Sequence, residues 1–443
     1  MKKNINIISK ILGGFELSDD RWVNHAAFDS RKVKEGTLFF AISGKKVDGH
    51  SFLEEVATKG AVGAVVSKEY RGEGYGLSLI YVDDVKTALH TLAKKCYQEN
   101  PAYLIGVTGT VGKTTTKEFI ATLLEEKYPV YKSPGSANSQ VSFPLELLNR
   151  DETKSILVLE MGMSFPGELT KLIEIAPPTL GVMTKVSLVH TENFPDLEAI
   201  ARAKGEMFQS DQTELAILNH QTSGFESIKK IRCPKCFYSI ETHGVDYFLE
   251  REGNTLFLWE KGKKHPLQLP FEESHLCEDA LAAIAVARHL KLSFEEIERG
   301  AKKLTPFLHR FQKIVKEGVL FIDDSYNASP EGMRAALRNL PKPEKGKKTI
   351  AVFGAMKELG AFSEKCHREI GEEALPYIDH LICYGNECAS MITTFAEKKK
   401  PAELLGDLKE IKRRIANIVE KGDVVLLKGA NSLRMWEILE SLQ

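Results

Sequence analysis

The sequence predicts an α/β protein of three domains: a small mixed α/β domain, a central domain with a mostly parallel sheet, and a doubly wound C-terminal domain. The length of 443 residues suits about three domains of ~150 residues each. Apolar runs that end in glycine and lead into helices recur after the first quarter of the chain, which is typical of parallel sheets. Asn100–Pro101 and Thr305–Pro306 interrupt this pattern. We therefore expect boundaries that give domains 1–98, 99–306 and 307–443.

The composition excludes several classes of protein. The chain is 43% hydrophobic and 27% charged, which is ordinary for a soluble globular protein. A net charge of −1 argues against nucleic-acid binding through bulk charge. No apolar run approaches the length of a membrane span and no signal-peptide core follows Met1, so we expect a cytoplasmic protein without membrane insertion. We interpret Cys233 and Cys236 as a chance pair, because a structural zinc site needs four ligands.

Residues 1–98 contain short apolar runs separated by turns, as in a small α/β module. The expected elements are a strand within 36–44, a helix with Ser51 as its N-cap, strands at 60–66 and 77–82, and a helix at 85–97. Ser30 and Arg31, beside Asp29, precede the first strand. These residues could hold a phosphate or carboxylate, or could form a solvated charged turn.

A strand, a glycine turn and a helix open the central domain after Tyr103. Gly109 and Gly112 interrupt the apolar run, and the expected helix covers residues 115–124. Backbone N–H groups at such a helix start bind phosphate, Lys113 adds a positive charge, and the Thr114 hydroxyl can ligate Mg²⁺. The chain has Gly-Thr-Val-Gly-Lys-Thr and lacks the first glycine of the full P-loop pattern. The context predicts a P-loop ATPase-like domain; the alternative is an ordinary glycine turn.

The rest of the central domain places polar residues at strand ends. Glu160 ends a predicted strand at 155–160, where an acid commonly serves Mg²⁺, although it could also cap the next loop. His190 follows a strand at 179–184, and Lys204 lies in a helix at 197–208. The remaining expectations are a strand at 215–219, β-hairpins within 236–269, and helices at 276–290 and 294–304.

The C-terminal domain repeats the order strand, glycine, helix. The expected strands lie at 311–314, 319–324, 349–353, 380–384 and 423–427, with a helix at 331–340. Such repeats are typical of a Rossmann-like doubly wound sheet that binds ligands at the carboxyl ends of its strands.

Four separated motifs carry more specific information. They are Asp29-Ser-Arg-Lys-Val-Lys-Glu-Gly-Thr-Leu-Phe39, Gly109-Thr-Val-Gly-Lys-Thr-Thr115, Asp324-Ser-Tyr-Asn-Ala-Ser-Pro330, and Gly354-Ala-Met-Lys-Glu-Leu-Gly-Ala-Phe-Ser363 with His367. Together they resemble the motifs of the Mur ligases, ATP-dependent enzymes that build the peptide of bacterial cell-wall precursors. The resemblance covers all three domains. Within the family, the sequence is similar to the branch that adds D-alanyl-D-alanine to UDP-N-acetylmuramoyl-tripeptide. The Asp-Asn-Pro-Arg signature of the branch that adds the third residue of the peptide is absent.

The resemblance implies a reaction in two steps. A substrate carboxylate attacks the γ-phosphate of ATP to give an acyl phosphate, and the amine of D-alanyl-D-alanine then displaces phosphate, leaving ADP and phosphate as by-products. Residues 1–98 would bind the UDP-muramoyl substrate, 99–306 would bind ATP, and 307–443 would close on ATP and the dipeptide. The resemblance also implies two Mg²⁺ ions, and we expect a monomer.

The resemblance assigns roles to individual residues. Lys113, Lys204 and His190 would be catalytic. The ATP-binding residues would be Gly109, Thr110, Val111, Gly112, Lys113, Thr114 and Thr115, with Arg310 on the phosphates, Asp324 on the ribose and His275 near adenine. The ligands of Mg²⁺ would be Thr114, Glu160, His190 and a carbamylated Lys204. The residues on the side of the muramoyl and dipeptide substrates would be Ser30, Arg31, Asp48, His50, Asn138, Gln140, Asn327, Lys428 and Ser432.

Several positions depart from the family pattern. Val111 replaces a small or polar residue, and Thr184-Lys185 stands where asparagine is usual. Leu276 and Asp279 replace asparagines that commonly follow the family histidine, and His309 replaces a glycine. These departures affect the expected surroundings of the second metal and of adenine.

Other functions remain open from sequence. The nearest alternatives are a sister amino-acid-adding Mur ligase and a folate polyglutamate ligase; the N-terminal domain argues against the folate enzyme. A nucleotide-switched binding module would use the same loop without ligating anything. Phosphate release that depends on D-alanyl-D-alanine separates these possibilities.

Overall fold

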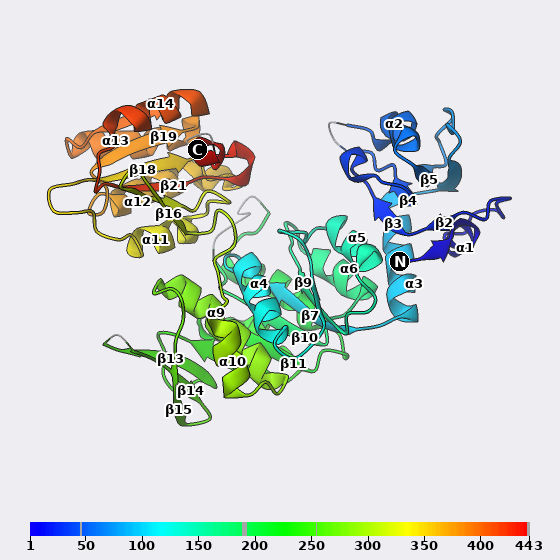
Figure 1. Ribbon diagram of the computed structural model, residues 1–443, viewed down its shortest axis with the longest axis horizontal. Coiled ribbons are helices and arrows are strands. Elements are labelled where there is room, and N and C mark those ends of the chain that lie inside the picture. The colour runs from blue at the N-terminus through cyan, green and yellow to red at the C-terminus, as the bar shows by residue number, and fades with distance from the viewer. Residues whose placement is uncertain (45–46, 188–192, 254, 441–443) are drawn as a thin grey trace.

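The computed structural model describes the chain except for residues 45–46, 188–192, 254 and 441–443 (Figure 1). It contains three sheets of four or more strands, one in each third of the molecule, and helices pack on each of them. The predicted α/β fold class is confirmed. Within the described residues, no helix is long and apolar enough to cross a membrane.

The N-terminal sheet has four parallel strands in sequence order. They are β3 (His25–Ala27), β4 (Thr37–Phe40), β5 (Ala61–Ser67) and β6 (Ser78–Val82). A two-stranded antiparallel ribbon, β1 (Lys3–Asn4) and β2 (Trp22–Val23), flanks α1 (Ile5–Ile11). The predicted Ser51 cap is wrong: the Asp48 carboxylate accepts from the N–H of His50 and caps a 3₁₀ turn, which continues into α2 (Leu53–Thr58). Helix α3 (Val85–Glu99) then packs against the central domain.

The central sheet has nine strands and is covered on both faces, as a parallel sheet requires. Its order is β15-β14-β13-β12-β11-β10-β7-β9-β8. The strands are β7 (Tyr103–Thr108), β8 (Val130–Lys132), β9 (Ile156–Glu160), β10 (Leu180–Met183), β11 (Leu215–Asn219), β12 (Lys235–Ser239), β13 (Tyr247–Glu252), β14 (Thr255–Glu260) and β15 (Lys263–Leu267). Leu104 faces one cluster of buried side chains, whereas Ile105 and Val107 face another.

The helices of the central domain divide between these two faces. Those on the Ile105 face are α4 (Lys113–Leu124), α9 (Ser274–His289) and α10 (Phe294–Ala301). Those on the Leu104 face are α5 (Ser142–Asn149), α6 (Glu168–Ile175), α7 (Leu197–Gly205) and the short α8 (Glu226–Lys229). This layering leaves the carboxyl ends of β7, β9 and β10 at one edge of the domain.

The prediction of β-hairpins throughout 236–269 is partly wrong. Strand β12 is parallel to β11, and β13 is parallel to β12; only β13, β14 and β15 form an antiparallel meander. The buried ring of Tyr238 belongs to the same cluster as α9, so β12 extends the covered parallel sheet. Alternating polarity alone does not distinguish these two arrangements.

The C-terminal sheet has six strands in the order β16-β17-β21-β18-β19-β20. Strand β16 (Gln312–Lys316) is antiparallel to β17 (Val319–Asp323), and the others are parallel: β18 (Thr349–Gly354), β19 (His380–Tyr384), β20 (Ala402–Leu405) and β21 (Val424–Lys428). Helices α11 (Pro330–Arg338), α12 (Ser363–Ala374) and α13 (Ala389–Glu397) share one core, and α14 (Leu408–Ile418) and α15 (Glu437–Glu440) share the other. This is the predicted doubly wound arrangement.

Candidate active site

A cavity of about 760 Å³ lies between the central and C-terminal domains. Its walls come from the loops that follow β7, β9 and β10 in one domain and β17, β18 and β21 in the other, where α/β sheets bind ligands. The sequence-predicted residues that line it are Gly109, Thr110, Val111, Gly112, Lys113, Thr115, Asn138, Gln140, Lys204, His275, Arg310, Asp324, Asn327, Lys428 and Ser432. The structure therefore brings together residues that lie far apart in the sequence.

The loop from Gly109 to Gly112 requires glycine at both ends. Gly109 has φ +142° and Gly112 has φ +83°. A Cβ atom on Gly109 would lie 1.8 Å from Thr184 Oγ1, and one on Gly112 would lie 2.3 Å from Asp279 Oδ1. Both backbone conformation and space therefore exclude a side chain, as expected where a loop wraps around phosphate.

We expect Gly112→Ala to weaken ATP binding by roughly tenfold or more, since a strained residue costs about 1–3 kcal/mol and 1.4 kcal/mol is tenfold. The matched control is Gly244→Ala, because Gly244 also has positive φ, but a Cβ atom there would meet no other atom within 4 Å. Isothermal titration with ATP measures both variants. Equal affinities for the two variants would contradict the steric argument.

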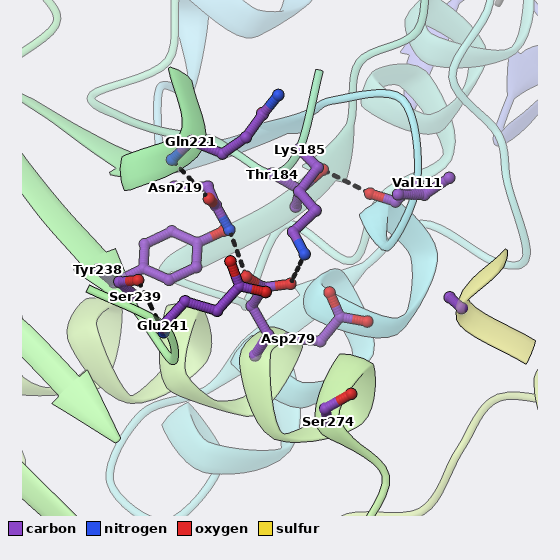
Figure 2. Close-up of polar contacts among 12 residues, drawn as sticks. Val111, Thr184, Lys185, Asn219, Gln221, Tyr238, Ser239, Glu241, Ser274 and Asp279 are labelled. Carbon is purple, nitrogen blue, oxygen red and sulfur yellow. Dashed lines mark hydrogen bonds and ion pairs between the residues drawn. The ribbon is translucent and has the colours of Figure 1, made fainter. Parts of the chain in front are cut away.

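The loop is fixed by hydrogen bonds to the residues after β10. Thr184 Oγ1 donates to the carbonyl of Val111 at 2.6 Å (Figure 2). The N–H of Thr110 donates to the carbonyl of Lys185 at 2.8 Å. The Thr110 hydroxyl donates to the carbonyl of Ser187 at 3.2 Å. Val111 thus contributes its backbone carbonyl, which any residue could supply, and the departure at this position leaves the loop geometry intact.

Lys113 and Lys204 meet at one carbonyl oxygen. Lys113 Nζ lies 3.0 Å from the carbonyl of Gly109 and 3.2 Å from that of Thr110, and Lys204 Nζ lies 2.9 Å from the Gly109 carbonyl. Burial lowers the pKa of Lys113. Burial and the charge of Lys113 together hold the pKa of Lys204 well below its usual range, although Glu160 opposes them. Lys204 is 3% exposed, so its side chain lies in the interior and not on the exposed surface of α7.

Glu160 and Thr114 lie together beneath the loop. Thr114 Oγ1 donates to Glu160 Oε2 at 2.8 Å, and Asn138 Nδ2 donates to Glu160 Oε1 at 2.7 Å. A carboxylate beside a hydroxyl is a donor set that suits Mg²⁺, which prefers hard oxygen ligands. Lys204 as an amine is a hydrogen-bond donor and offers no such oxygen. The predicted His190 lies outside the described residues.

Arg310 extends from the C-terminal domain to the P-loop helix. Its Nη2 lies 3.4 Å from Thr114 Oγ1, and its guanidinium lies 4.2 Å from the ring centre of Tyr326. Its Nε atom is buried and has no partner among the described residues. The Tyr326 hydroxyl contacts the Ser136 hydroxyl of the central domain. A cation with unused donors beside the phosphate loop suits an anionic ligand.

Asp324 and Lys428 form a buried pair on the C-terminal wall. Lys428 Nζ lies 2.5 Å from Asp324 Oδ2 and 3.1 Å from the carbonyl of Asn327. The N–H of Phe311 donates to Asp324 Oδ1 at 3.1 Å. Both carboxylate oxygens of Asp324 therefore accept from the protein, and Lys428 orients this carboxylate at the cavity wall.

A polar network that sequence reasoning missed joins β10, β11 and α9. Lys185 Nζ lies 2.8 Å from Glu278 Oε2, and Asn219 Nδ2 donates to Glu278 Oε1 at 2.9 Å. Figure 2 shows Lys185, Asn219 and Asp279 gathered at the start of α9. Burial alone would lower the pKa of Lys185, but the adjacent Glu278 outweighs it and raises this pKa. Only the unusual Thr184-Lys185 and Asp279 positions hinted at this network in the sequence.

Asp279 supports the phosphate loop from behind. Thr116 Oγ1 donates to Asp279 Oδ1 at 3.0 Å, and the carboxyl lies against the Cα of Gly112. Burial, followed by the charge of Glu278, raises the pKa of Asp279 well above its usual range. This shift favours the protonated carboxyl, which places no negative charge behind a phosphate site.

His275 lies at the second residue of α9, where the cavity reaches this helix. Its ring packs edge-on against Phe311 at 5.0 Å, and its Nδ1 is buried without a partner among the described residues. Burial lowers the pKa of His275 to about 4, so the imidazole is neutral at pH 7. An unpaired ring nitrogen lining the cavity fits the predicted place beside a ligand.

We expect His275 to make the protein more sensitive to acid. The folded-state pKa of about 4 lies below the ordinary 6.5, so between these values the unfolded chain binds more protons than the folded one. The resulting stability is fully present above about pH 6.5 and is lost as the pH falls towards 4. Between pH 7.5 and pH 5.0, the melting temperature of His275→Gln should fall less than that of the wild type. The control is His243→Gln, in which the replaced histidine is exposed. If the melting temperature of His275→Gln fell as much as that of the wild type, the prediction would be contradicted.

The predicted substrate residues of the N-terminal domain do not line this cavity. Arg31 pairs with Asp29 at 2.7 Å, and Ser30 is buried. His50 Nδ1 lies 2.7 Å from the Asp48 carboxylate, and its Nε2 accepts from the N–H of Ser67 at 3.0 Å. The structure therefore leaves these four residues on a separate domain from the P-loop.

Lys117 connects the phosphate loop to the loop at 133–140. This side chain is fully buried in α4, and its Nζ lies 2.5 Å from the carbonyls of both Ser133 and Gly135. Glu118 Oε1 lies 3.0 Å from the same nitrogen. Helix α4 therefore begins at Lys113 in the phosphate loop, and Lys117, one turn later, binds the loop that contains Asn138 and Gln140.

Comparison with known proteins gives three matching family models. Residues 23–97 match the Mur ligase family catalytic domain, 107–287 the Mur ligase middle domain, and 309–431 the Mur ligase glutamate ligase domain. The UDP-N-acetylmuramoyl-tripeptide–D-alanyl-D-alanine ligase of Bacillus subtilis strain 168 is 32% identical over 95% of this chain and 93% of its own length.

Solved structures agree with this similarity. A MurF ligase from Thermotoga maritima in complex with ADP has a TM-score of 0.78 and 29% identity, covering 94% of this chain and 96% of its own. The UDP-N-acetylmuramoylalanyl-D-glutamyl-2,6-diaminopimelate–D-alanyl-D-alanyl ligase of Acinetobacter baumannii has a TM-score of 0.83 and 24% identity, covering 100% and 98%. This second likeness is evidence of a shared fold.

Proposed function

Because the chain belongs to the Mur ligase family, we propose that it joins D-alanyl-D-alanine to UDP-N-acetylmuramoyl-tripeptide and converts ATP to ADP and phosphate. The observation that carries this function is one cavity that contains the P-loop lysine Lys113, the loop of Asn138 and Gln140, and the C-terminal residues Lys428 and Ser432. ATP, the substrate carboxylate and the amine of the dipeptide can thus meet in this cavity. The product belongs to peptidoglycan precursor synthesis.

The residues of the phosphate loop account for the first step. The substrate carboxylate attacks the γ-phosphorus, the bond to ADP breaks, and an acyl phosphate forms. This step brings two negative groups together, so the positive charges of Lys113 and Arg310 lower the repulsion. Backbone N–H groups from Val111 to Thr115 would hold the phosphates, because the N–H of Thr110 already donates to the carbonyl of Lys185.

The second step forms the amide bond. The amine of the dipeptide attacks the acyl carbon, the carbon–oxygen bond to phosphate breaks, and the amine releases a proton to water. Lys428 and Ser432 lie on the C-terminal wall, where they support binding of the dipeptide, and Asn327 lies beside them. Asp324 and His275 line the remaining wall towards the nucleoside.

We propose that the site uses Mg²⁺. Thr114 and Glu160 would hold one ion, since their oxygens already lie 2.8 Å apart, and bound Mg²⁺ would supply charge neutralisation for the phosphates. His190 would serve the second ion, as the family resemblance implies.

We also propose that Lys204 is carbamylated. Burial lowers the pKa of this amine well below its usual range and so favours the uncharged form, which is the form that adds CO₂ with loss of one proton. The product is a carboxylate-like group, which would turn Lys204 from a donor to the Gly109 carbonyl into an oxygen ligand beside Glu160.

The division into domains 1–98, 99–306 and 307–443 remains a proposal, supported by one sheet of four or more strands in each part. We propose that residues Ser30, Arg31, Asp48 and His50 bind the uridine side of the muramoyl substrate. We also propose that the protein is a monomer and, because ATP is its substrate, that its location is cytoplasmic.

The test is phosphate release by the purified protein with ATP, UDP-N-acetylmuramoyl-tripeptide and an acceptor. We expect release only when D-alanyl-D-alanine is present. Release with a single amino acid would identify a sister Mur ligase, and release with a folate and glutamate would identify a folate ligase. Nucleotide binding without acceptor-dependent release would indicate a binding module.

A further inference from the structure

The cationic side chains that line the cavity differ in whether they have a partner. Most are engaged: Lys113 and Lys204 with backbone carbonyls, Lys185 with Glu278, Lys357 with Glu387, Lys428 with Asp324, and Arg310 with Thr114 and Tyr326. Lys86 also lines the cavity, and no hydrogen-bond or ion-pair partner for it is found among the described residues. An exposed ammonium group on a cavity wall is free to bind an anion.

Lys86 has a defined position because its helix is fixed to the central domain. It lies in the first turn of α3, which the Asp84 carboxylate caps. His90 follows one turn later on the same helix face, and its Nε2 lies 2.6 Å from the carbonyl of Gln140. This contact holds the Lys86 face of α3 beside the loop that contains Asn138 and Gln140.

The positive charge at this wall comes from lysine and not from His90. Burial lowers the pKa of His90; the bond to the Gln140 carbonyl and the charge of Asp84 oppose this, whereas Lys86 and Lys171 lower it further. His90 is therefore neutral at pH 7. Lys171, on α6, adds to the same positive field but does not line the cavity.

Gln140 provides a second, independent sign of a ligand. Its side chain is 6% exposed, and its Nε2 donates to the carbonyl of Glu168 at 2.8 Å. Its Oε1 is buried and accepts no hydrogen bond from the described residues, which is costly unless a ligand supplies a donor. The wall thus offers a cation and, near it, an acceptor that needs an N–H group.

We propose that Lys86 binds a carboxylate of the peptide in the muramoyl substrate, while Gln140 accepts a peptide N–H. A peptide that carries free carboxylates provides both groups, whereas a phosphate provides no N–H donor. The inference rests on the proposed function and adds Lys86 as a positioning and specificity-determining residue, which holds the peptide so that its reacting carboxylate faces the P-loop.

Two carboxylates of the peptide could be the one that binds Lys86. One belongs to the D-glutamyl residue, and the other is the second carboxylate of a 2,6-diaminopimelate in the third position, the peptide for which the Acinetobacter relative is named. A lysine in the third position lacks that second carboxylate and brings an ammonium group, which Lys86 repels. Substrates with diaminopimelate and with lysine therefore distinguish the two sources.

The experiment compares Lys86→Gln, Lys86→Arg and the matched control Lys94→Gln. Lys94 is exposed on the same helix and does not line the cavity. KM is measured for both forms of UDP-N-acetylmuramoyl-tripeptide and for ATP. We expect Lys86→Gln to raise KM for the muramoyl substrate about tenfold, as loss of a charged hydrogen bond does, with an unchanged KM for ATP. Lys86→Arg should retain most of the affinity.

An increase in KM with both peptides supports binding of the D-glutamyl carboxylate, and an increase only with diaminopimelate supports its second carboxylate. An unchanged KM with both peptides, or an equal increase in Lys94→Gln or in KM for ATP, overturns the role of Lys86. If the wild type shows no phosphate release that depends on D-alanyl-D-alanine, the proposed function itself fails.

Discussion

Replacing Lys113 by alanine should reduce turnover by about a thousandfold or more, since loss of a single charge-stabilising donor already costs about 10²–10³ in rate. The Lys113 ammonium lies against the carbonyls of Gly109 and Thr110 at the phosphate loop. Lys204 cannot replace it, because Lys204 is held at the same Gly109 carbonyl and has a strongly lowered pKa. A coupled ADP assay with both substrates at saturation measures the change.

The matched control for Lys113→Ala is Lys127→Ala. Lys127 follows the same helix, and its Nζ donates to the carbonyl of Lys291 at 2.6 Å, away from the cavity. This control should keep wild-type turnover. A Lys113→Ala enzyme that works within tenfold of the wild type would show that phosphate charge is stabilised elsewhere, with Arg310 the first residue to examine.

Replacing Lys204 by alanine should also nearly abolish turnover, and short carboxylic acids should restore part of it. The small side chain would leave space at this position, and an added carboxylate could take the place of the proposed carbamate. Acetate and propionate in the assay provide the test, at constant ionic strength. No recovery at any concentration would refute the carbamate assignment.

A chemical control distinguishes the roles of the two lysines. The same acids should not restore Lys113→Ala, because a carboxylate cannot replace a cation at the phosphate loop. Carbon-13 NMR of the wild type in labelled bicarbonate provides a direct readout, with Lys204→Ala as the blank. A carbamate signal that is present in the wild type and absent from the variant is the expected result.

Patterns that depend on neighbouring residues in the chain were predictable. The strand–glycine–helix unit around Gly109 and Gly112 was confirmed, because an apolar strand, left-handed glycines and a helix start all lie within a few residues. Glu160 was placed correctly at the end of β9, beside the loop, for the same reason. Such units depend mainly on residues that are close together in the chain.

Features that depend on packing were not predictable to the same extent. The parallel pairing of β12 depends on the cover that α9 gives to Tyr238, which lies far from it in sequence. The cap at Asp48 rather than Ser51 depends on a 3₁₀ turn before the helix. The bond between Lys185 and Glu278 joins separate elements, so the sequence could show only that Lys185 and the neighbouring Asp279 are unusual.

The burial of Lys117 has a consequence for the evolution of inhibitor resistance. Because Lys117 binds the loop of Asn138 to the helix that begins at Lys113, the phosphate loop and the loop proposed to bind the peptide are joined to one helix. A compound that spans both loops would contact surfaces that cannot shift independently. A substitution that moves one of these loops away from such a compound would also move the other loop away from the natural substrate. We therefore expect few substitutions that give resistance and keep activity.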